Sequence, residues 1–171
     1  EYLEGVELEA LVKTRELLER PFDLAKIAIQ ICHALEHAHG KGIIHRDLKP
    51  GNIILVEENG GYKVKIVDFG IAKIQEEVQR LTKTGHALGS PLYMSPEQCM
   101  GKQVDARSDI YSLGILLYEA ATGEIPYLGK DLSDTLRMHC EPDIKPKPLH
   151  EVASQIPCHN QLYSIILKAV W

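Results

Sequence analysis

The sequence predicts an α+β fold that is mainly α-helical, and three observations support this. Apolar residues recur at helical spacing over residues 24–38 and 162–170, whereas residues 109–123 are apolar on nearly every face. Two short apolar runs, 53–56 and 64–67, flank a Glu-Glu-Asn-Gly-Gly segment that is typical of a β-hairpin turn. With 171 residues, 44% of them hydrophobic, the chain is long enough to bury one sizeable core, so one lobe is expected.

The first long helix is expected to end just before a run of charged residues, because Gly40 and Gly42 supply a stop signal after its apolar stripe. His33, His37 and His39 lie in its second half, where positions four apart share a helix face. A metal site there would lack an evident third ligand. We therefore interpret these histidines as part of a partly exposed helix face.

The run His45-Arg46-Asp47-Leu48-Lys49-Pro50-Gly51-Asn52 follows this helix and concentrates polar chemistry in one short loop. Transfer of a phosphoryl group to a hydroxyl spreads negative charge over the phosphate oxygens, so catalysis requires positioning and charge neutralisation. Asp47 is a candidate acceptor for the hydroxyl proton. Lys49, two residues further on, can reach the transferred phosphate from the same loop.

Two further residues are candidate metal ligands. Asn52 ends the first run, and Asp68, sixteen residues later, begins an Asp-Phe-Gly sequence. Their amide and carboxylate oxygens are the hard ligands that Mg²⁺ takes. The hairpin between them is expected to bring both to one metal site. Phe69 can pack so as to set the direction of Asp68, and Gly70 gives the backbone freedom after it.

Together these runs resemble the catalytic and metal-binding loops of the protein kinase family, H-R-D-L-x-x-x-N and D-F-G. Ser95-Pro96-Glu97 stands where that family has A-P-E. The chain is similar to the large, C-terminal lobe of a eukaryotic-like (Hanks-type) serine/threonine protein kinase of the bacterial kind. In the alternative interpretation, His45, Asp47 and Asp68 are turn and capping residues of an ordinary α/β domain. The order and number of the motifs argue against it.

The resemblance implies transfer of the γ-phosphate of ATP, with Mg²⁺ or Mn²⁺, to a protein substrate. The hairpin of the kinase-like C-lobe would then carry the catalytic and metal-binding loops. Ser90 matches the hydroxyl of the family's Gly-Thr-Pro sequence, which hydrogen-bonds the catalytic aspartate and lysine. With Lys49, it favours serine and threonine over tyrosine as the accepting residue.

Residues 71–94 lack sustained periodicity, and long loops of this kind are usually functional or disordered. By resemblance this segment is the activation segment. Arg46 is the family's partner for a phosphate on that loop. Thr82 and Thr84 are the phosphorylation candidates, and an equally open alternative is that they are two solvated loop threonines.

The resemblance also assigns structural roles to His45, Phe69, Gly70, Glu97 and Asp109. Asp109 is expected to hold the backbone of the catalytic loop; the simpler alternative is a helix N-cap, and the two roles are compatible. Glu97 corresponds to a buried glutamate that pairs with a downstream arginine, expected beyond residue 171.

Residues 1–7 resemble the hinge that joins the two lobes of a kinase and contacts adenine. Five residues are expected to bind the nucleotide: Glu1, Leu3, Glu7, Gly51 and Ile54. Glu1 and Leu3 would contact adenine through a carbonyl and an amide, Glu7 could meet the ribose, and Ile54 would lie under the ring.

These features describe a partial kinase domain, with a hinge at 1–7 and a C-lobe at 8–171 that is cut at its C-terminal end. The family's small-lobe elements are expected upstream, since no G-x-G-x-x-G sequence occurs here. Two functions remain open. Either the chain is the large lobe of an active kinase and is inactive without its N-lobe, or it is a non-catalytic truncated fragment, a pseudokinase-like module that binds a partner through its cleft face.

Composition narrows the class of partner. A net charge of −5 and a pI near 5.9 argue against nucleic acid as the main partner. Four scattered cysteines show no metal or redox spacing and fit a reducing, cytoplasmic setting. The apolar run at 109–123 is too short to span a membrane, so membrane attachment is expected only through segments outside this chain. The proline-containing stretch 141–148 is expected to be an extended linker rather than a proline-rich ligand.

Overall fold

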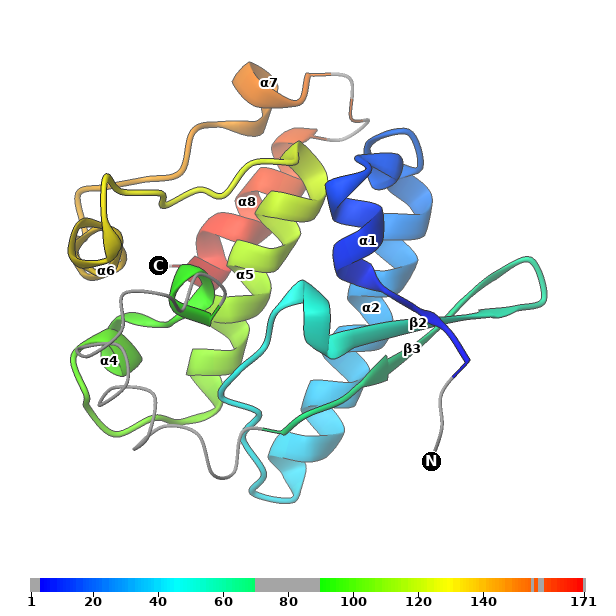
Figure 1. Cartoon of the computed structure of the whole chain (residues 1–171), viewed down its shortest axis with the longest axis horizontal. Coiled ribbons are helices and arrows are strands. Elements are labelled where there is room, and N and C mark those ends of the chain that lie inside the picture. The colour runs from blue at the N-terminus through cyan, green and yellow to red at the C-terminus, as the bar shows by residue number, and fades with distance from the viewer. Residues whose placement is uncertain (1–3, 70–89, 155, 157–158, 171) are drawn as a thin grey trace.

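The computed structural model describes residues 4–69, 90–154, 156 and 159–170. Helix α5 (Ala106–Thr122) lies at the centre, between α2 (Pro21–Gly40) and α8 (His159–Val170), and a small sheet packs against α2 (Figure 1). This arrangement confirms the expected α+β class with helices in the majority.

The sheet is antiparallel and has the order β1-β2-β3, formed by Val6–Glu7, Ile53–Glu58 and Gly61–Ile66. The predicted hairpin is therefore present, but its strands extend further than expected. Asn59 and Gly60 have φ values of 52° and 76°, the left-handed pair that a two-residue turn needs. The turn is thus confined to these two residues, so the adjacent glutamates lie in β2.

Helix α2 begins with proline at its first position, where the missing N–H costs nothing. Its apolar stripe is buried. Gln30, on the side facing the hairpin, donates from Nε2 to the Tyr62 carbonyl (2.8 Å) and accepts from the Val64 N–H at Oε1 (3.1 Å). These bonds join α2 to the backbone of β3 and fix the hairpin against the helix.

Helix α5 is buried around almost its whole circumference, as the sequence predicts. Its N-cap is Asp105, which accepts a hydrogen bond from the Arg107 N–H (2.8 Å), so the suggestion that Asp109 is the N-cap was wrong. A Cβ at Gly114 would lie 2.7 Å from Val170 Cγ1, which shows how closely α8 packs on this helix.

Shorter elements complete the chain: α1 (Leu8–Lys13), η1 (Glu16–Leu18), η2 (Pro50–Asn52), η3 (Ser90–Tyr93), α4 (Pro96–Cys99), α6 (Leu132–Cys140) and α7 (Leu149–Val152). The stretch 141–148 between α6 and α7 forms neither helix nor strand, and it contains a turn in which the Ile144 N–H donates to the Glu141 carbonyl (3.2 Å). Within the part of the chain that the structure describes, no helix is both long and apolar enough to cross a membrane.

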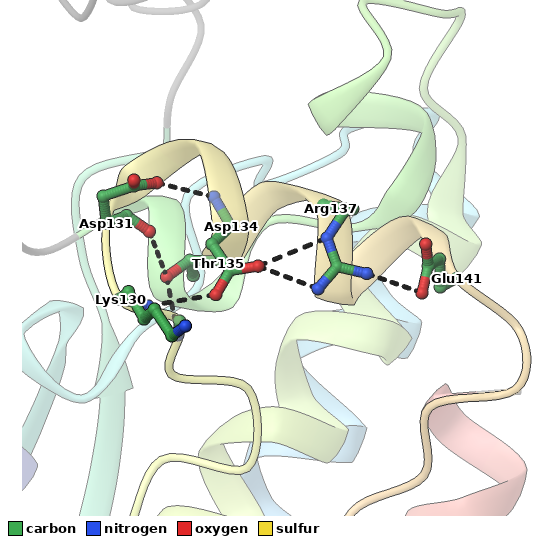
Figure 2. A network of polar contacts seen from close by, with 7 residues as sticks. Lys130, Asp131, Asp134, Thr135, Arg137 and Glu141 are labelled. Atoms are coloured by element: carbon green, nitrogen blue, oxygen red, sulfur yellow. Dashed lines mark hydrogen bonds and ion pairs between the residues drawn. The ribbon is translucent and has the colours of Figure 1, made fainter.

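Helix α6 is held by a continuous network of polar contacts (Figure 2). Asp131 caps it by accepting from the Asp134 N–H (2.8 Å), and the Asp134 carboxylate accepts in turn from the Lys130 N–H (3.1 Å). Arg137 bridges Asp134 (2.8 Å) and Glu141 (2.7 Å). The helix is therefore tied to the loop before it and to the residue after it.

Candidate active site

The loop that carries Asp47 and Lys49 is held in place by the buried carboxylate of Asp109. Asp109 Oδ2 accepts from the His45 N–H (2.8 Å), and Asp109 Oδ1 accepts from the Arg46 N–H (2.8 Å). His39 Nε2 donates a third hydrogen bond to Oδ2 (2.7 Å). Asp109 therefore makes the backbone contacts expected of it, while sequence reasoning left His39 on a partly exposed helix face and missed this contact.

A second contact reaches the same loop from the segment that carries Ser95-Pro96-Glu97. The Gln98 side chain donates from Nε2 to the Arg46 carbonyl (2.7 Å) and accepts from the Ser95 N–H at Oε1 (3.0 Å). Arg46 has φ of 69°, a left-handed conformation that is unfavourable for a residue with a side chain. Its N–H and its C=O are thus both bound by distant side chains, one from α5 and one from α4.

His45 joins the loop to the end of the hairpin. It is fully buried, its Nδ1 accepts from the Asp47 N–H (3.3 Å), and its Nε2 donates to the Val67 carbonyl (2.9 Å). The ring of Phe69 lies against it, with centroids 4.6 Å apart. The imidazole therefore fixes the position of the loop relative to Asp68, which follows Val67.

Asp47, Lys49 and Asn52 form a compact polar cluster. Asp47 Oδ2 accepts from Lys49 Nζ (3.0 Å) and from Asn52 Nδ2 (3.2 Å), and Nδ2 also donates to the Asp47 carbonyl (2.7 Å). The Asp47 carboxylate is therefore held by two donors from its own loop. Because the amide nitrogen of Asn52 faces Asp47, its amide oxygen is turned away from Asp47.

The hairpin brings the two candidate metal ligands close together in the fold. Asn52 and Val67 lie opposite one another at the open end of the hairpin, where the Val67 N–H donates to the Asn52 carbonyl (3.0 Å). Asp68 comes next, exposed and with φ of 55°. Among the described residues, no three His, Cys, Asp or Glu side chains are arranged to hold a metal ion. An ion bound by Asn52 and Asp68 would take its other ligands from phosphate or water.

The structure describes three of the five residues that are expected to contact the nucleotide. Glu7 in β1 lies opposite Ile54 in β2, with Glu7 exposed and Ile54 half-buried. Gly51 lies in η2, directly before that strand. The remaining two, Glu1 and Leu3, lie outside the described residues.

Other expected site residues also lie outside the described part of the chain, namely Gly70, Thr82 and Thr84. The backbone of Ser90 begins η3. Glu97 was expected to be buried, but it is half-buried, because it borders a cavity of about 480 Å³ that Arg107 and Lys168 also line. Its carboxylate accepts a hydrogen bond from the Ser108 hydroxyl.

A second, half-buried carboxylate lies near η3, that of Glu119. Tyr93 donates from its hydroxyl to Glu119 Oε2 (2.6 Å). Burial raises the pKa of Glu119 above its ordinary value, and the Tyr93 hydrogen bond opposes that rise. Burial, followed by the charge of Glu119, also raises the pKa of the Tyr93 hydroxyl. Sequence reasoning described residues 109–123 as apolar on nearly every face and did not identify this pair.

Comparison with known proteins agrees with this geometry. Residues 1–167 match the family model described as protein kinase domain. The chain belongs to the protein kinase family. Its relatives include serine/threonine-protein kinase Pkn1 of Myxococcus xanthus, 41% identical over 149 residues, which cover 86% of this chain and 21% of the relative.

Two other relatives align over almost the whole kinase chain. Serine/threonine-protein kinase PknB of Mycobacterium leprae is 40% identical over 171 residues, covering 99% of this chain and 26% of the relative. Probable serine/threonine-protein kinase CPE1738 of Clostridium perfringens is 42% identical over 172 residues, covering 99% of this chain and 24% of the relative. The resemblance to Hanks-type bacterial kinases is confirmed, and the chain spans about a quarter of the length of these relatives.

Proposed function

We propose that residues 8–171 act as the catalytic large lobe of a serine/threonine kinase, with residues 1–7 as its hinge. The reaction is transfer of the ATP γ-phosphate to a serine or threonine hydroxyl of a protein substrate. The observation that carries the proposal is the Asp47 carboxylate, held at 3.0 Å by Lys49 and at 3.2 Å by Asn52. A merely structural aspartate in a turn would not need a lysine of its own loop directed at it.

In this reaction Asp47 orients the accepting hydroxyl and takes its proton. Lys49 neutralises negative charge that develops beside Asp47 during transfer. Bound ATP supplies the phosphoryl group, and a bound Mg²⁺ or Mn²⁺ neutralises its charge. Asn52 and Asp68 fit such an ion because both offer hard oxygen ligands at the open end of one hairpin. Asp109, Gln98 and His45 keep the loop in the conformation that this arrangement needs.

The remaining assignments extend the proposal. Glu1, Leu3, Glu7, Gly51 and Ile54 bind the nucleotide, supported by the pairing of Glu7 with Ile54 across β1 and β2. Arg46 binds a phosphate on Thr82 or Thr84, and Ser90 supports Asp47 and Lys49. We place the reaction in the cytoplasm, where ATP is available.

The test uses the kinase domain that contains this lobe, with transfer of labelled phosphate from ATP and Mg²⁺ to a generic basic protein as the readout. We expect Asp47→Asn and Asp68→Asn each to abolish turnover, because one removes the proton acceptor and the other a metal ligand. Asp143→Asn is the matched control, since Asp143 is an exposed aspartate in the linker after α6. Full activity in either site variant would refute the role assigned to that residue.

The 171-residue chain alone is expected to give no turnover, because the family's Gly-rich loop does not occur among these residues. Turnover by the chain alone that Asp47→Asn abolishes would contradict this expectation. Loss of activity in Asp143→Asn as well would show instead that the assay reports folding rather than chemistry.

A further inference from the structure

Two cysteines that lie far apart in the sequence are neighbours in the fold. Cys99 is the last residue of α4 and Cys140 the last residue of α6, and these two helices pack together. Their Sγ atoms lie 3.9 Å from the carbonyl oxygens of Met94 and Pro96 respectively, which belong to one short stretch of backbone. Cys140 is also close enough to contribute to the raised pKa of the Cys99 thiol. The structure therefore holds a pair of thiols that the sequence spacing did not reveal.

The fold itself imposes this proximity, because each helix is fixed by contacts that do not involve sulfur. A capping box holds α4, in which Ser95 and Gln98 exchange hydrogen bonds. The polar network of Figure 2 holds α6, with Arg137 bridging Asp134 and Glu141 directly beside Cys140. The two thiols consequently meet without any large movement of either helix.

We propose that Cys99 and Cys140 form a reversible disulfide when the protein meets a peroxide. A peroxide oxygen is first transferred to the sulfur of Cys140, which becomes a sulfenic acid, and the peroxide is reduced to water. The sulfur of Cys99 then attacks the Cys140 sulfur. The S–S bond forms, the S–O bond breaks, and the departing hydroxide leaves with the Cys99 proton as a second water. A small dithiol returns two electrons and two protons and restores both thiols.

The order of the two steps follows from the access of a small oxidant to Cys140 and from the low acidity of Cys99. Cys140 lines a cavity of about 190 Å³, together with His139 and Pro142, through which a small oxidant can reach it. Burial, followed by the presence of Cys140, raises the pKa of the Cys99 thiol to about 12. Because the thiolate is the attacking species, Cys99 is a weak nucleophile that relies on proximity.

The test treats the full 171-residue chain with hydrogen peroxide, blocks the remaining thiols by alkylation and maps all four cysteines by mass spectrometry without reduction. We expect one cross-linked peptide pair containing Cys99 and Cys140, reversed by dithiothreitol. The cross-link should raise the melting temperature by about 5–10 °C, because it closes a long loop in the unfolded chain. Alkylation of both residues after peroxide treatment, or equal cross-linking of the exposed Cys32, would overturn the proposal.

Two variants separate the role of Cys140, the thiol that is oxidised first, from the role of Cys99, the thiol that attacks it. Cys140→Ser should leave Cys99 alkylatable after peroxide, whereas Cys99→Ser should leave Cys140 as a sulfenic acid that dimedone traps. Cys32→Ser is the matched control and should leave the cross-link unchanged. Should the site variants fail to fold, phenylarsine oxide, which bridges neighbouring thiols, provides a second measurement on the unmodified chain. It should protect Cys99 and Cys140 together from alkylation, and protection of neither would overturn the proposal.

Discussion

Replacement of Asp109 by asparagine tests how much the buried carboxylate beneath the catalytic loop contributes to stability. The carboxylate is 1% exposed and accepts three hydrogen bonds, from the His45 and Arg46 N–H groups and from the His39 imidazole. Asparagine has the same shape but only one accepting oxygen. If that oxygen faces His45 and His39, the amide NH₂ faces the Arg46 N–H, and two donors then meet.

The magnitude follows from this geometry. The substitution removes at least one hydrogen bond to a charged group, each worth about 1.5–3 kcal/mol, and leaves the part-buried Arg46 N–H without its acceptor. We therefore expect the free energy of unfolding to fall by about 2–4 kcal/mol, a large share of the roughly 5–15 kcal/mol of a typical domain. Alanine would remove all three acceptor contacts and should cost more.

The assay is urea unfolding of the chain followed by far-ultraviolet circular dichroism. Asp105→Asn is the matched control, because Asp105 caps the same helix from an exposed position and asparagine caps about equally well. A change of less than about 0.5 kcal/mol in Asp109→Asn, similar to that expected of an ordinary surface substitution, would refute the reasoning.

Three further changes give separate tests of the structure. Burial lowers the pKa of His139 to about 4 from its ordinary 6.5. The unfolded chain therefore binds a proton below pH 6.5 that the folded chain binds only below pH 4, and the free energy of unfolding should fall by about 3 kcal/mol as the pH falls between these values. In Gly129→Ala the new Cβ would lie 2.5 Å from the Thr135 backbone nitrogen, so we expect a loss of about 1–3 kcal/mol in urea unfolding. In Gln98→Glu the cap acceptor remains but the donor to the Arg46 carbonyl is lost, which should cost about 1 kcal/mol and, in an active kinase domain, lower kcat more than it raises the KM for ATP.

Each of these tests has its own control. His139→Gln should show a flatter fall in stability between pH 6.5 and pH 4 than the unchanged chain, and equal slopes would contradict the linkage. Gly61→Ala places its Cβ no closer than 3.9 Å to the Glu58 carbonyl and should be close to neutral. If Gln98→Glu keeps the wild-type kcat, Gln98 serves only the helix cap.

The sequence located the central cluster because its members lie in one short loop. Asp47, Lys49 and Asn52 have fixed spacing, so the motif itself determines that they meet. His39 and Gln98 could not be found in this way, since each donates to a partner that comes from a distant part of the chain and no local pattern records the pairing. The contact between Cys99 and Cys140 was missed for the same reason, because it depends on how α4 packs against α6.

The fold was predicted best where periodicity extended over several turns, as in α2 and α5. Strand β1 was not predicted, because two residues are too few to show the alternation of apolar and polar side chains that indicates a strand. Sequence reasoning offered Asp109 as a possible N-cap of α5, because aspartate is favoured at that position, whereas the structure has Asp105 there. Only the hydrogen bonds distinguish the two: one carboxylate bonds to its own helix and the other to the catalytic loop.

The contact of Gln30 with β3 also affects how the molecule meets its neighbours. Strand β3 is an edge strand of the described sheet, and such edges offer unpaired N–H and C=O groups to strands of other molecules. The Gln30 amide imitates one peptide unit of an adjacent strand, since it binds the Tyr62 carbonyl and the Val64 N–H together. An incoming strand would find these two groups already bonded and the helix in its path. The side chain that attaches α2 to the hairpin therefore also protects this edge from intermolecular β-pairing and aggregation.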